Sequence, residues 1–247
     1  MHVDFVIVTY HSEAVIGPCL ESIFRYTPDP KTVFVIDNGS EDGTLREASS
    51  FPNAIILANG ENAGYAKAAN RGIRAGSGDV IAVMNADTKV TEGWLEPLLD
   101  CLLGDEKVAL VGPKMINRHN QLVSTGTDWN WTMPSFMEQN RQGLLEETRD
   151  CMVINGACFL MKRELTGRLG LMDENYFFYF EETDYCFQAL HNGYRVVYCP
   201  QSLIYHEYEN NTPLRSDMIS KHWNDSRDYF DRKWAGRPIR NPHGAAD

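Results

Sequence analysis

Carboxylate and amide side chains stand at two places where an apolar segment of the sequence ends. Asn85-Ala86-Asp87 follows the apolar run VIAVM at 80–84, which is typical of a strand covered on both faces. Glu181, Glu182 and Asp184 follow four consecutive aromatic residues. Carboxylates can ligate a divalent cation, and they can also take a proton from a hydroxyl group. The spacing therefore indicates two acidic centres that could act on one substrate.

Strand and helix patterns alternate ahead of the first centre. We expect strands at 3–10, 31–40, 54–60 and 79–87, and helices at 12–26, with Ser12 as its cap, and at 63–76. Such alternation predicts a parallel sheet, with its ligand crevice at the carboxyl ends of the strands. The polar clusters fall at those ends: Thr9-Tyr10, 37–40, 59–62, and Asn85 with Asp87. Any single cluster could simply form a turn, but four together favour a site.

The second half has a different pattern. We expect a helix at 94–103, a strand at 108–116, a polar insertion without clear period at 117–150, a helix from Glu181 to a stop at Gly193, and strands at 194–200 and from about Gln201. No Pro/Gly/Ser-rich linker divides the chain, so we expect a single domain over 1–247.

Composition restricts the partners and the compartment. The 247 residues carry a net charge of −11, which argues against nucleic acid as a partner. No segment reaches the roughly 20 apolar residues of a membrane-spanning helix, and the N-terminus does not fit a signal peptide. The six cysteines form no C-x-x-C pair, as expected of reduced thiols. We therefore expect a cytoplasmic protein.

Three stretches together resemble the inverting glycosyltransferases of family two, and in particular their rhamnosyltransferase-like bacterial branch. They are VIVTYHSEAVIGPCLESI with VFVIDNGSEDGT, ENAGYAKAANRGIRAGSGDVIAVMNADT, and GACFLMKRELTGRLGLMDENYFFYFEETDYCFQALHNGYRVVYCP. The resemblance implies an α/β GT-A fold with a mostly parallel central sheet flanked by helices. It also implies a nucleotide-sugar-binding half at 1–112, an acceptor-binding and catalytic-base half at 113–247, and a UDP- or dTDP-sugar donor.

The resemblance assigns donor-binding roles to residues of the first half. Asp37 matches the aspartate that accepts a hydrogen bond from the ring N–H of uracil or thymine, and Thr9 matches a position lining the nucleoside pocket. Asn62, Gly64, Lys67 and Asn70 match the pattern N-x-G-x-x-x-A-x-N-x-G. Glycine and a helix N-terminus would let the backbone approach a diphosphate. The alternatives are that Asp37 forms a turn and that the small residues of 63–76 only pack the helix against the sheet.

Asn85-Ala86-Asp87 matches the D-x-D metal motif of the family, with asparagine first. The resemblance makes Asp87 the principal acidic ligand of Mg²⁺ or Mn²⁺, with Asn85 beside the substrate. His206 matches a histidine that often serves as a second ligand, although a lone histidine can equally be structural. Because the motif lacks its first aspartate, the metal site could be weak or dispensable.

Glu181-Glu182-Thr183-Asp184 occupies the place of the family motif E-D-x-D. We assign the catalytic base to Glu182, which matches the second acid, with Glu181 as the substitute. Asp184 would bind the acceptor or cap the structure. Acidic residues in a first helical turn are also favoured by the helix dipole alone. Gly156 matches a glycine turn beneath the sugar pocket.

The acceptor would be a glycan or a lipid-linked precursor. Trp129, Trp131, Phe136 and Tyr179 could stack on its sugar rings or pack a lid. The segment 222–240 could be an interfacial helix for peripheral membrane association or a domain-closing helix. The glycine-rich loops of nucleotidylyltransferases and dinucleotide oxidoreductases are absent after the first strand. The alternative to an enzyme is a non-catalytic nucleotide-sugar-binding module.

Overall fold

A computed structural model of the protein describes residues 1–129, 146–207 and 216–241, with side chains from 221 onward in the last range. The strands are β1 (Val3–Thr9), β2 (Lys31–Asp37), β3 (Ala54–Ala58), β4 (Val80–Asn85), β5 (Thr88–Val90), β6 (Val108–Ile116), β7 (Leu122–Ser124), β8 (Arg149–Asp150), β9 (Cys158–Lys162) and β10 (Arg195–His206). The helices are α1 (Ile16–Tyr26), α2 (Thr44–Ser49), α3 (Tyr65–Ala75), α4 (Leu95–Gly104), the 3-10 helix η1 (Arg163–Leu165), α6 (Thr166–Leu169), α7 (Glu181–His191) and α8 (Ser216–Trp234).

The strands form one sheet in the order β3-β2-β1-β4-β9-β6-β10-β5, with β7 paired to β6 and β8 to β10. β1, β2, β3 and β4 run parallel to one another, as predicted. The second half is mixed, because β9 runs antiparallel between β4 and β6 while β10 runs parallel to β6. The central α/β sheet with flanking helices is therefore confirmed, and its parallel part is concentrated in the first half.

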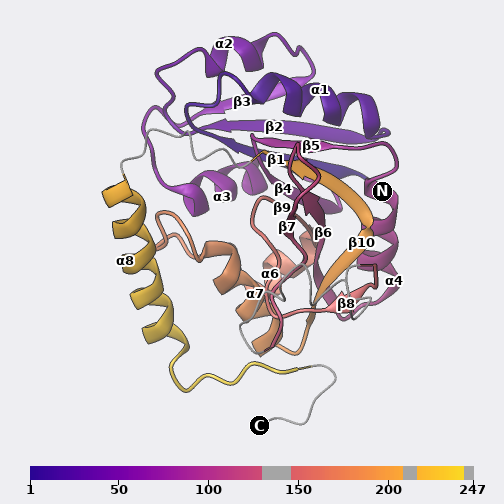
Figure 1. The fold of residues 1–247 in the computed structure, drawn as a ribbon, viewed down its shortest axis with the longest axis vertical. Coiled ribbons are helices and arrows are strands. Elements are labelled where there is room, and N and C mark those ends of the chain that lie inside the picture. Colours follow the sequence, from indigo (N-terminus) through magenta and orange to yellow (C-terminus); the bar gives the residue numbers. More distant parts are fainter. Residues whose placement is uncertain (130–145, 208–215, 242–247) are drawn as a thin grey trace.

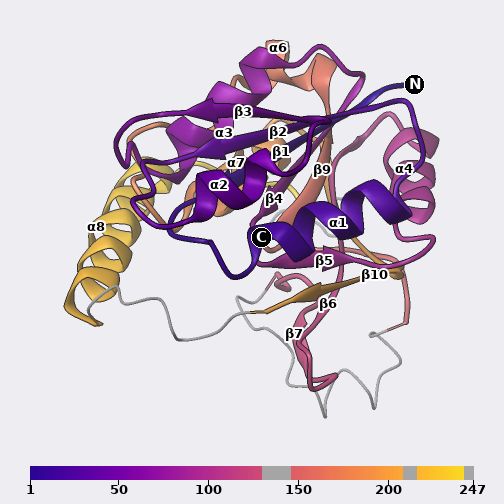
Figure 2. The same ribbon diagram turned by 90° about the horizontal axis from the view of Figure 1, so that it is seen from above.

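Apolar residues fill both faces of this sheet. On one face, alternate residues of β1 and β2 pack with α3, α7 and α8. On the other face, the intervening residues pack with α1 and α4. In both views α8 runs along one side of the molecule, outside the sheet (Figure 1, Figure 2). Burial on both faces explains the continuous apolar runs of β1 and β4.

The structure differs from three of the secondary-structure predictions. The first helix begins at Ile16 without a side-chain cap, because Ser12 forms the preceding turn and accepts the Ile16 N–H through its carbonyl oxygen. The predicted insertion carries β7 and β8 within its described parts. The two strands expected after Gly193 are one strand, β10, in which residues 200–202 have no partner in β6 because Cys199 pairs with Pro113 and Leu203 with Lys114.

No helix within the described ranges combines the length and the apolar character needed to cross a bilayer.

Candidate active site

Thr9 and Asp37 lie side by side at the carboxyl ends of β1 and β2. They are partners in the parallel register, and the Asn38 N–H donates to the Thr9 carbonyl oxygen at 2.8 Å. Asp37 Oδ2 accepts the backbone N–H groups of Gly39 and Ser40 at 3.2 and 3.1 Å. Within the described residues, no hydrogen-bond partner reaches the buried Thr9 Oγ1 or Asp37 Oδ1. Because buried polar atoms are normally hydrogen-bonded, this pair is ready to bind a ligand.

Asparagine side chains connect the loops that follow β2 and β3. Asn38 Nδ2 donates to Asn62 Oδ1 at 2.8 Å, and Asn59 Nδ2 donates to Asn38 Oδ1 at 2.9 Å. Asn62 Oδ1 also accepts the Gly64 N–H at 3.1 Å. The structure therefore brings Asn62 next to the loop after Asp37, where it holds the shape of the turn into α3.

Gly64 is required at the start of α3 by its conformation and by its neighbour. Its φ is +88°, and an added Cβ would lie 2.8 Å from the carbonyl oxygen of Phe177. That same oxygen accepts the Tyr65 N–H at 2.8 Å. The absence of a side chain at Gly64 thus lets the start of α3 pack directly against the segment that leads to Glu181.

Asn70 lies inside the protein and its amide is fully used there. Asn70 Nδ2 donates to the Met172 carbonyl oxygen at 2.8 Å and to Glu174 at 3.0 Å, and Asn70 Oδ1 accepts the Met172 N–H at 3.1 Å. The predicted binding role of Asn70 is therefore replaced by a structural one. Lys67, one turn earlier, is exposed, and its charge contributes to lowering the pKa of Glu174.

Backbone pairing places Asp87 beside His206, although 119 positions separate them in sequence. Thr88 pairs with His206 across β5 and β10, and the Glu207 N–H donates to the Asp87 carbonyl oxygen at 2.9 Å. Asp87 Oδ1 and His206 Nε2 are 3.3 Å apart. Within the described part of the chain, no hydrogen-bond donor reaches Asp87 Oδ1. The two predicted metal ligands are thus brought together.

An oxygen and an imidazole nitrogen form a donor set that suits Mn²⁺ or Mg²⁺. In the described ranges, no group of three or more His, Cys, Asp or Glu side chains is arranged to hold a metal ion. Asp87 and His206 could supply two ligands to a divalent cation, whose other ligands would have to be oxygen atoms of substrate or water.

The turn 155–157 contacts both the carboxyl end of β4 and the start of α7. The Asn85 N–H donates to the Ala157 carbonyl oxygen at 2.9 Å, and the Tyr65 hydroxyl donates to the Gly156 carbonyl oxygen at 3.3 Å. A Cβ added at Gly156 would lie 3.0 Å from Glu182 Cγ. Gly156 therefore leaves room for the Glu182 side chain directly beside the turn.

Glu181 and Glu182 form a closely coupled pair at the first turn of α7. Glu181 is 5% exposed, and within the described residues its Oε2 has no hydrogen-bond partner. Burial, reinforced by the charge of Glu182, raises the pKa of Glu181 well above its ordinary 4.5. Burial also raises the pKa of Glu182, while the hydroxyl of Thr183 donates to Glu182 Oε1 at 3.1 Å and opposes the rise.

Tyr65 is a member of the site that the sequence reasoning missed. Burial raises the pKa of its hydroxyl, and the charges of Glu181, Glu182 and Asp87 add to this effect. Its hydroxyl donates to the Gly156 carbonyl oxygen, and Gly156 lies directly beside the Glu182 side chain. Its position directly after Gly64 in the matched motif was the available signal, but a tyrosine at a helix start is ordinarily a packing residue.

Asp184 is bound on both carboxylate oxygens by groups of the protein. It is fully buried, and its two oxygens accept hydrogen bonds from Tyr176 (3.2 Å), Gln188 (3.2 Å), Lys233 (2.8 Å) and Trp234 (2.8 Å). Of the two predicted roles, acceptor binding and structural support, these contacts give Asp184 the second.

The predicted acceptor-stacking aromatics are only partly within the described residues. Trp129 is half-buried and packs against the hydrophobic cluster under α3 and α7. Tyr179 lies two residues before Glu181, with its ring 5.2 Å from that of Trp223. Trp131 and Phe136 lie outside the described residues.

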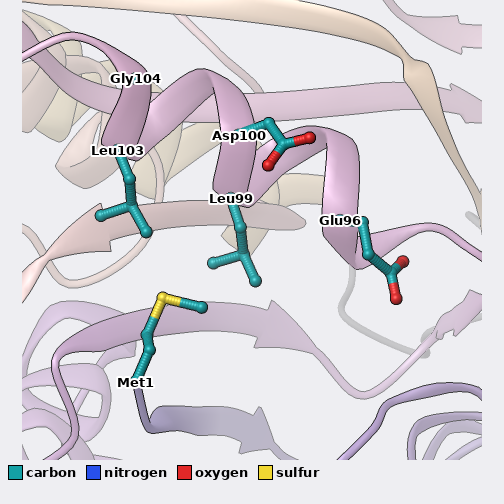
Figure 3. Close-up of a pocket in the computed structure, with 6 residues that line it drawn as sticks. All are labelled: Met1, Glu96, Leu99, Asp100, Leu103 and Gly104. Atoms are coloured by element: carbon teal, nitrogen blue, oxygen red, sulfur yellow. The ribbon is translucent and has the colours of Figure 1, made fainter.

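A separate surface hollow of about 500 Å³ is lined by Met1 and by one side of α4, with Leu99 and Leu103 projecting toward Met1 (Figure 3). It contains none of the residues of the candidate site, so we assign it no part in the chemistry.

A family model and several known proteins are similar to this chain. The family model for glycosyl transferase family 2 matches residues 4–170, more than half of the chain. The chain is 28% identical over 234 residues to the N-acetylglucosaminyl-diphospho-decaprenol L-rhamnosyltransferase of Mycobacterium tuberculosis, covering 84% of this chain and 76% of that protein. It is 23% identical to the glucosyl-dolichyl phosphate glucuronosyltransferase of Haloferax volcanii, covering 71% and 57% of the two chains.

Solved structures share the fold. GalNAc-T7 with UDP, GalNAc and Mn²⁺ superposes with a TM-score of 0.70 at 18% identity, covering 94% of this chain and 50% of that one. A mannosyltransferase of Pyrobaculum calidifontis in complex with GDP-Man and Mn²⁺ gives 0.69 at 19% identity, covering 99% and 65%. Our chain thus spans half to two thirds of these larger proteins, and the GT-A fold is confirmed. Together with the family model, these matches show that the chain belongs to glycosyltransferase family 2.

Proposed function

We propose that the protein transfers a sugar from a UDP- or dTDP-sugar to a hydroxyl group of a glycan or lipid-linked acceptor, with inversion at the anomeric carbon and with the help of Mg²⁺ or Mn²⁺. Residues 1–112 would bind the donor, and residues 113–247 would bind the acceptor and supply the base. The name of the mycobacterial relative favours rhamnose as the sugar and a lipid-linked acceptor.

The observation that carries this proposal is the placement of Asp87 and Glu182 around Tyr65 and the turn 155–157. Asp87 follows β4, whose last residue is bonded to that turn, and Glu182 packs against Gly156 on the other side. The Tyr65 hydroxyl donates to the Gly156 carbonyl oxygen at 3.3 Å, so it lies at the same turn. A diphosphate held at Asp87 and an acceptor hydroxyl held at Glu182 could therefore flank one anomeric carbon.

We assign the base to Glu182 because two adjacent buried carboxylates do not ionise equally. Glu181 is the more buried, with one oxygen lacking a partner among the described residues, so burial disfavours its ionised form and raises its pKa. Glu182 is half-buried and accepts the Thr183 hydroxyl, which favours its ionised form. In the reaction, the acceptor oxygen bonds to the anomeric carbon, the bond from that carbon to the diphosphate oxygen breaks, and Glu182 takes the hydroxyl proton.

Thr9 and Asp37 would bind the nucleobase. A fixed carboxylate accepts the ring N–H of uracil or thymine, and this matches Asp37 Oδ1, which has no partner in the described residues. Asp87 and His206 would hold the divalent cation, with Asn85 nearby. When bound, that cation supplies positive charge that stabilises the departing diphosphate. Asn62 and Gly64 would shape the donor loop, and Lys67 would offer its charge at the rim.

The alternative is a binding module that retains the pocket without turnover. The test incubates the purified protein and Mn²⁺ with dTDP-rhamnose, UDP-glucose or UDP-N-acetylglucosamine, with and without a lipid extract, and measures release of the nucleoside diphosphate. We expect release with one donor, and that donor should stabilise the fold by about 2.7 kcal/mol at a hundredfold excess over its Kd.

Glu182→Gln should bind that donor normally and lose about 10² to 10⁴ in rate. Glu181→Gln is the matched control, and a larger loss in the control would move the base to Glu181. Thermal stabilisation without release by the wild-type protein would establish the binding module. We place the protein in the cytoplasm, with peripheral attachment to the membrane when the acceptor is lipid-linked.

A further inference from the structure

The two residues immediately before the catalytic pair have an unusual backbone conformation. Tyr179 has a φ of +71° and Phe180 a φ of +69°, the left-handed region that residues with bulky side chains rarely adopt. Phe180 is the residue at the N-terminal boundary of α7, and its carbonyl oxygen accepts the Asp184 N–H at 2.8 Å. The direction in which Glu181 and Glu182 leave the turn is therefore set by a conformation that the surroundings must maintain.

Aromatic side chains of α8 enclose this turn. The Trp223 ring lies 5.2 Å from that of Tyr179 and 5.0 Å from that of Phe180, and Phe230 lies 5.4 Å from Phe180. The two Trp223 contacts are edge-to-face, a favoured geometry for aromatic pairs. Trp223 itself is 46% exposed, so its contacts with the turn are formed from the surface of the molecule.

A second set of contacts fixes α8 to α7 below the turn. Lys233 donates to Asp184 at 2.8 Å and to Asp173 at 2.6 Å, and Trp234 Nε1 donates to Asp184 at 2.8 Å. Desolvation lowers the pKa of Lys233, but the hydrogen bonds to Asp173 and Asp184 raise it by more. The net pKa is above the ordinary value, so the side chain stays charged. The buried Asp184 carboxylate is thus tied to the last turn of α8, while Trp223 covers the turn before α7.

We propose that α8 is a positioning element for the catalytic base. Through Trp223 and through the pair Lys233 and Trp234, it holds the left-handed turn and the first residues of α7, and so fixes where the Glu182 carboxylate lies. The Ser226 hydroxyl supports the same segment, since it donates to the Phe178 carbonyl oxygen at 2.9 Å. The inference rests on the proposed function, because it assumes that Glu182 is the base.

The test compares Lys233→Met with Arg232→Met. Both remove one positive charge from adjacent positions of α8, but Arg232 is exposed, and the hydrogen bonds to Asp173 and Asp184 come from Lys233 and Trp234. We expect kcat for nucleoside diphosphate release from the active donor to fall by about 10- to 100-fold in Lys233→Met, because misplacing a catalytic group by about 1 Å has an effect of this size. KM for the donor should stay within about twofold of the wild-type value, and Arg232→Met should resemble the wild type.

Hydrogen exchange gives a readout that does not require activity. Amides of 179–186 should exchange faster in Lys233→Met than in Arg232→Met, whereas amides of β1 and β2 should exchange equally in both. If Lys233→Met fails to fold, Trp234→Phe tests the inference in its place. This variant keeps an aromatic ring at position 234 and removes one hydrogen-bond donor to Asp184. The same kcat loss and local exchange are then expected.

Equal kcat and equal exchange in the Lys233 and Arg232 variants would overturn the inference. A parallel rise in donor KM would also overturn it, because a general loss of structure would then explain the result. If the wild-type protein releases nucleotide from no donor, the proposed function fails instead, and the exchange comparison still reports on the contact between α8 and the turn.

Discussion

The two acidic centres of the site are held in place by different means. Asp37 ends β2 in the parallel register with Thr9 of β1, and Asp87 is placed beside His206 by the antiparallel pairing of β5 with β10. Glu181 and Glu182 begin a helix after a strained turn, and residues of α8 about 40 to 50 positions later support that turn. The proposed donor side is therefore held by backbone pairing of strands, while the proposed base side depends on side-chain packing between helices.

Removing the Asp87 carboxylate should have the largest effect on the donor side. We expect Asp87→Asn to lower the rate of nucleotide release about 10²-fold or more, because a cation at a leaving group contributes several kcal/mol. The measurement is kcat as a function of Mn²⁺ concentration. Asp79→Asn, at the exposed opposite end of the same strand, is the control. An unchanged Mn²⁺ dependence in Asp87→Asn would remove Asp87 from the proposed metal site.

Replacing Asp37 should affect binding rather than turnover. Asp37→Asn removes a charged acceptor, so KM for the donor should rise about 10- to 100-fold with little change in kcat. Preference for uridine or thymidine over purine nucleotides should decrease as well, which competition by free nucleoside diphosphates measures. Glu41→Gln, an exposed acid in the same loop, should leave KM unchanged. If kcat falls and KM does not, Asp37 has a role other than base recognition.

The contact between the two halves can be tested with two glycines. Gly60 and Gly64 both have positive φ, at +78° and +88°, but only Gly64 has a neighbour within 4 Å of an added Cβ. Gly60→Ala should lower the free energy of unfolding by about 1–2 kcal/mol through backbone conformation alone. Gly64→Ala should lower it further, because the methyl group meets the Phe177 carbonyl oxygen. Urea unfolding measures both, and equal losses would show that the contact adjusts at no cost.

The smallest effect should be a dependence of stability on pH. The pKa of Glu181 is raised above 4.5 in the folded protein, so folding keeps a proton that the unfolded chain releases. Folding stability therefore falls as the pH rises from about 4.5 through the raised value, by up to about 1.4 kcal/mol per pKa unit. Glu181→Gln has no ionisable group at this position, so its folding stability should not fall in this pH range. Its unfolding free energy should exceed that of the wild type at neutral pH and match it below pH 4.5. A difference that does not vary with pH would contradict the assignment.

The donor side could be predicted from sequence because its signals are local. Apolar runs of strand length, each ending in polar residues, defined β1, β2 and β4 and placed Thr9, Asp37 and Asp87 at one edge. The base side could be predicted only in part. The acids at the start of α7 were recognised, but the buried bonding of Asp184 and the support from α8 arise from residues far apart in sequence, for which no spacing rule exists.

Asn70 shows the same limit. Its place in the motif suggested a ligand contact, yet its amide joins α3 to the segment before α7. Tyr65 could not be predicted from the sequence, because its aromatic ring fits a packing role. Only the fold shows which charges lie near its hydroxyl.

Residues 200–202 of β10, which have no partners in β6, carry a consequence for any engineered or natural change of length in that strand. The pairing of Leu203 with Lys114 and of His206 with Thr88 fixes the register after this bulge. A residue added or removed within 200–202 would therefore change the bulge and leave His206 beside Asp87, whereas the same change within 203–205 would shift the strand by one residue and turn the imidazole to the other face.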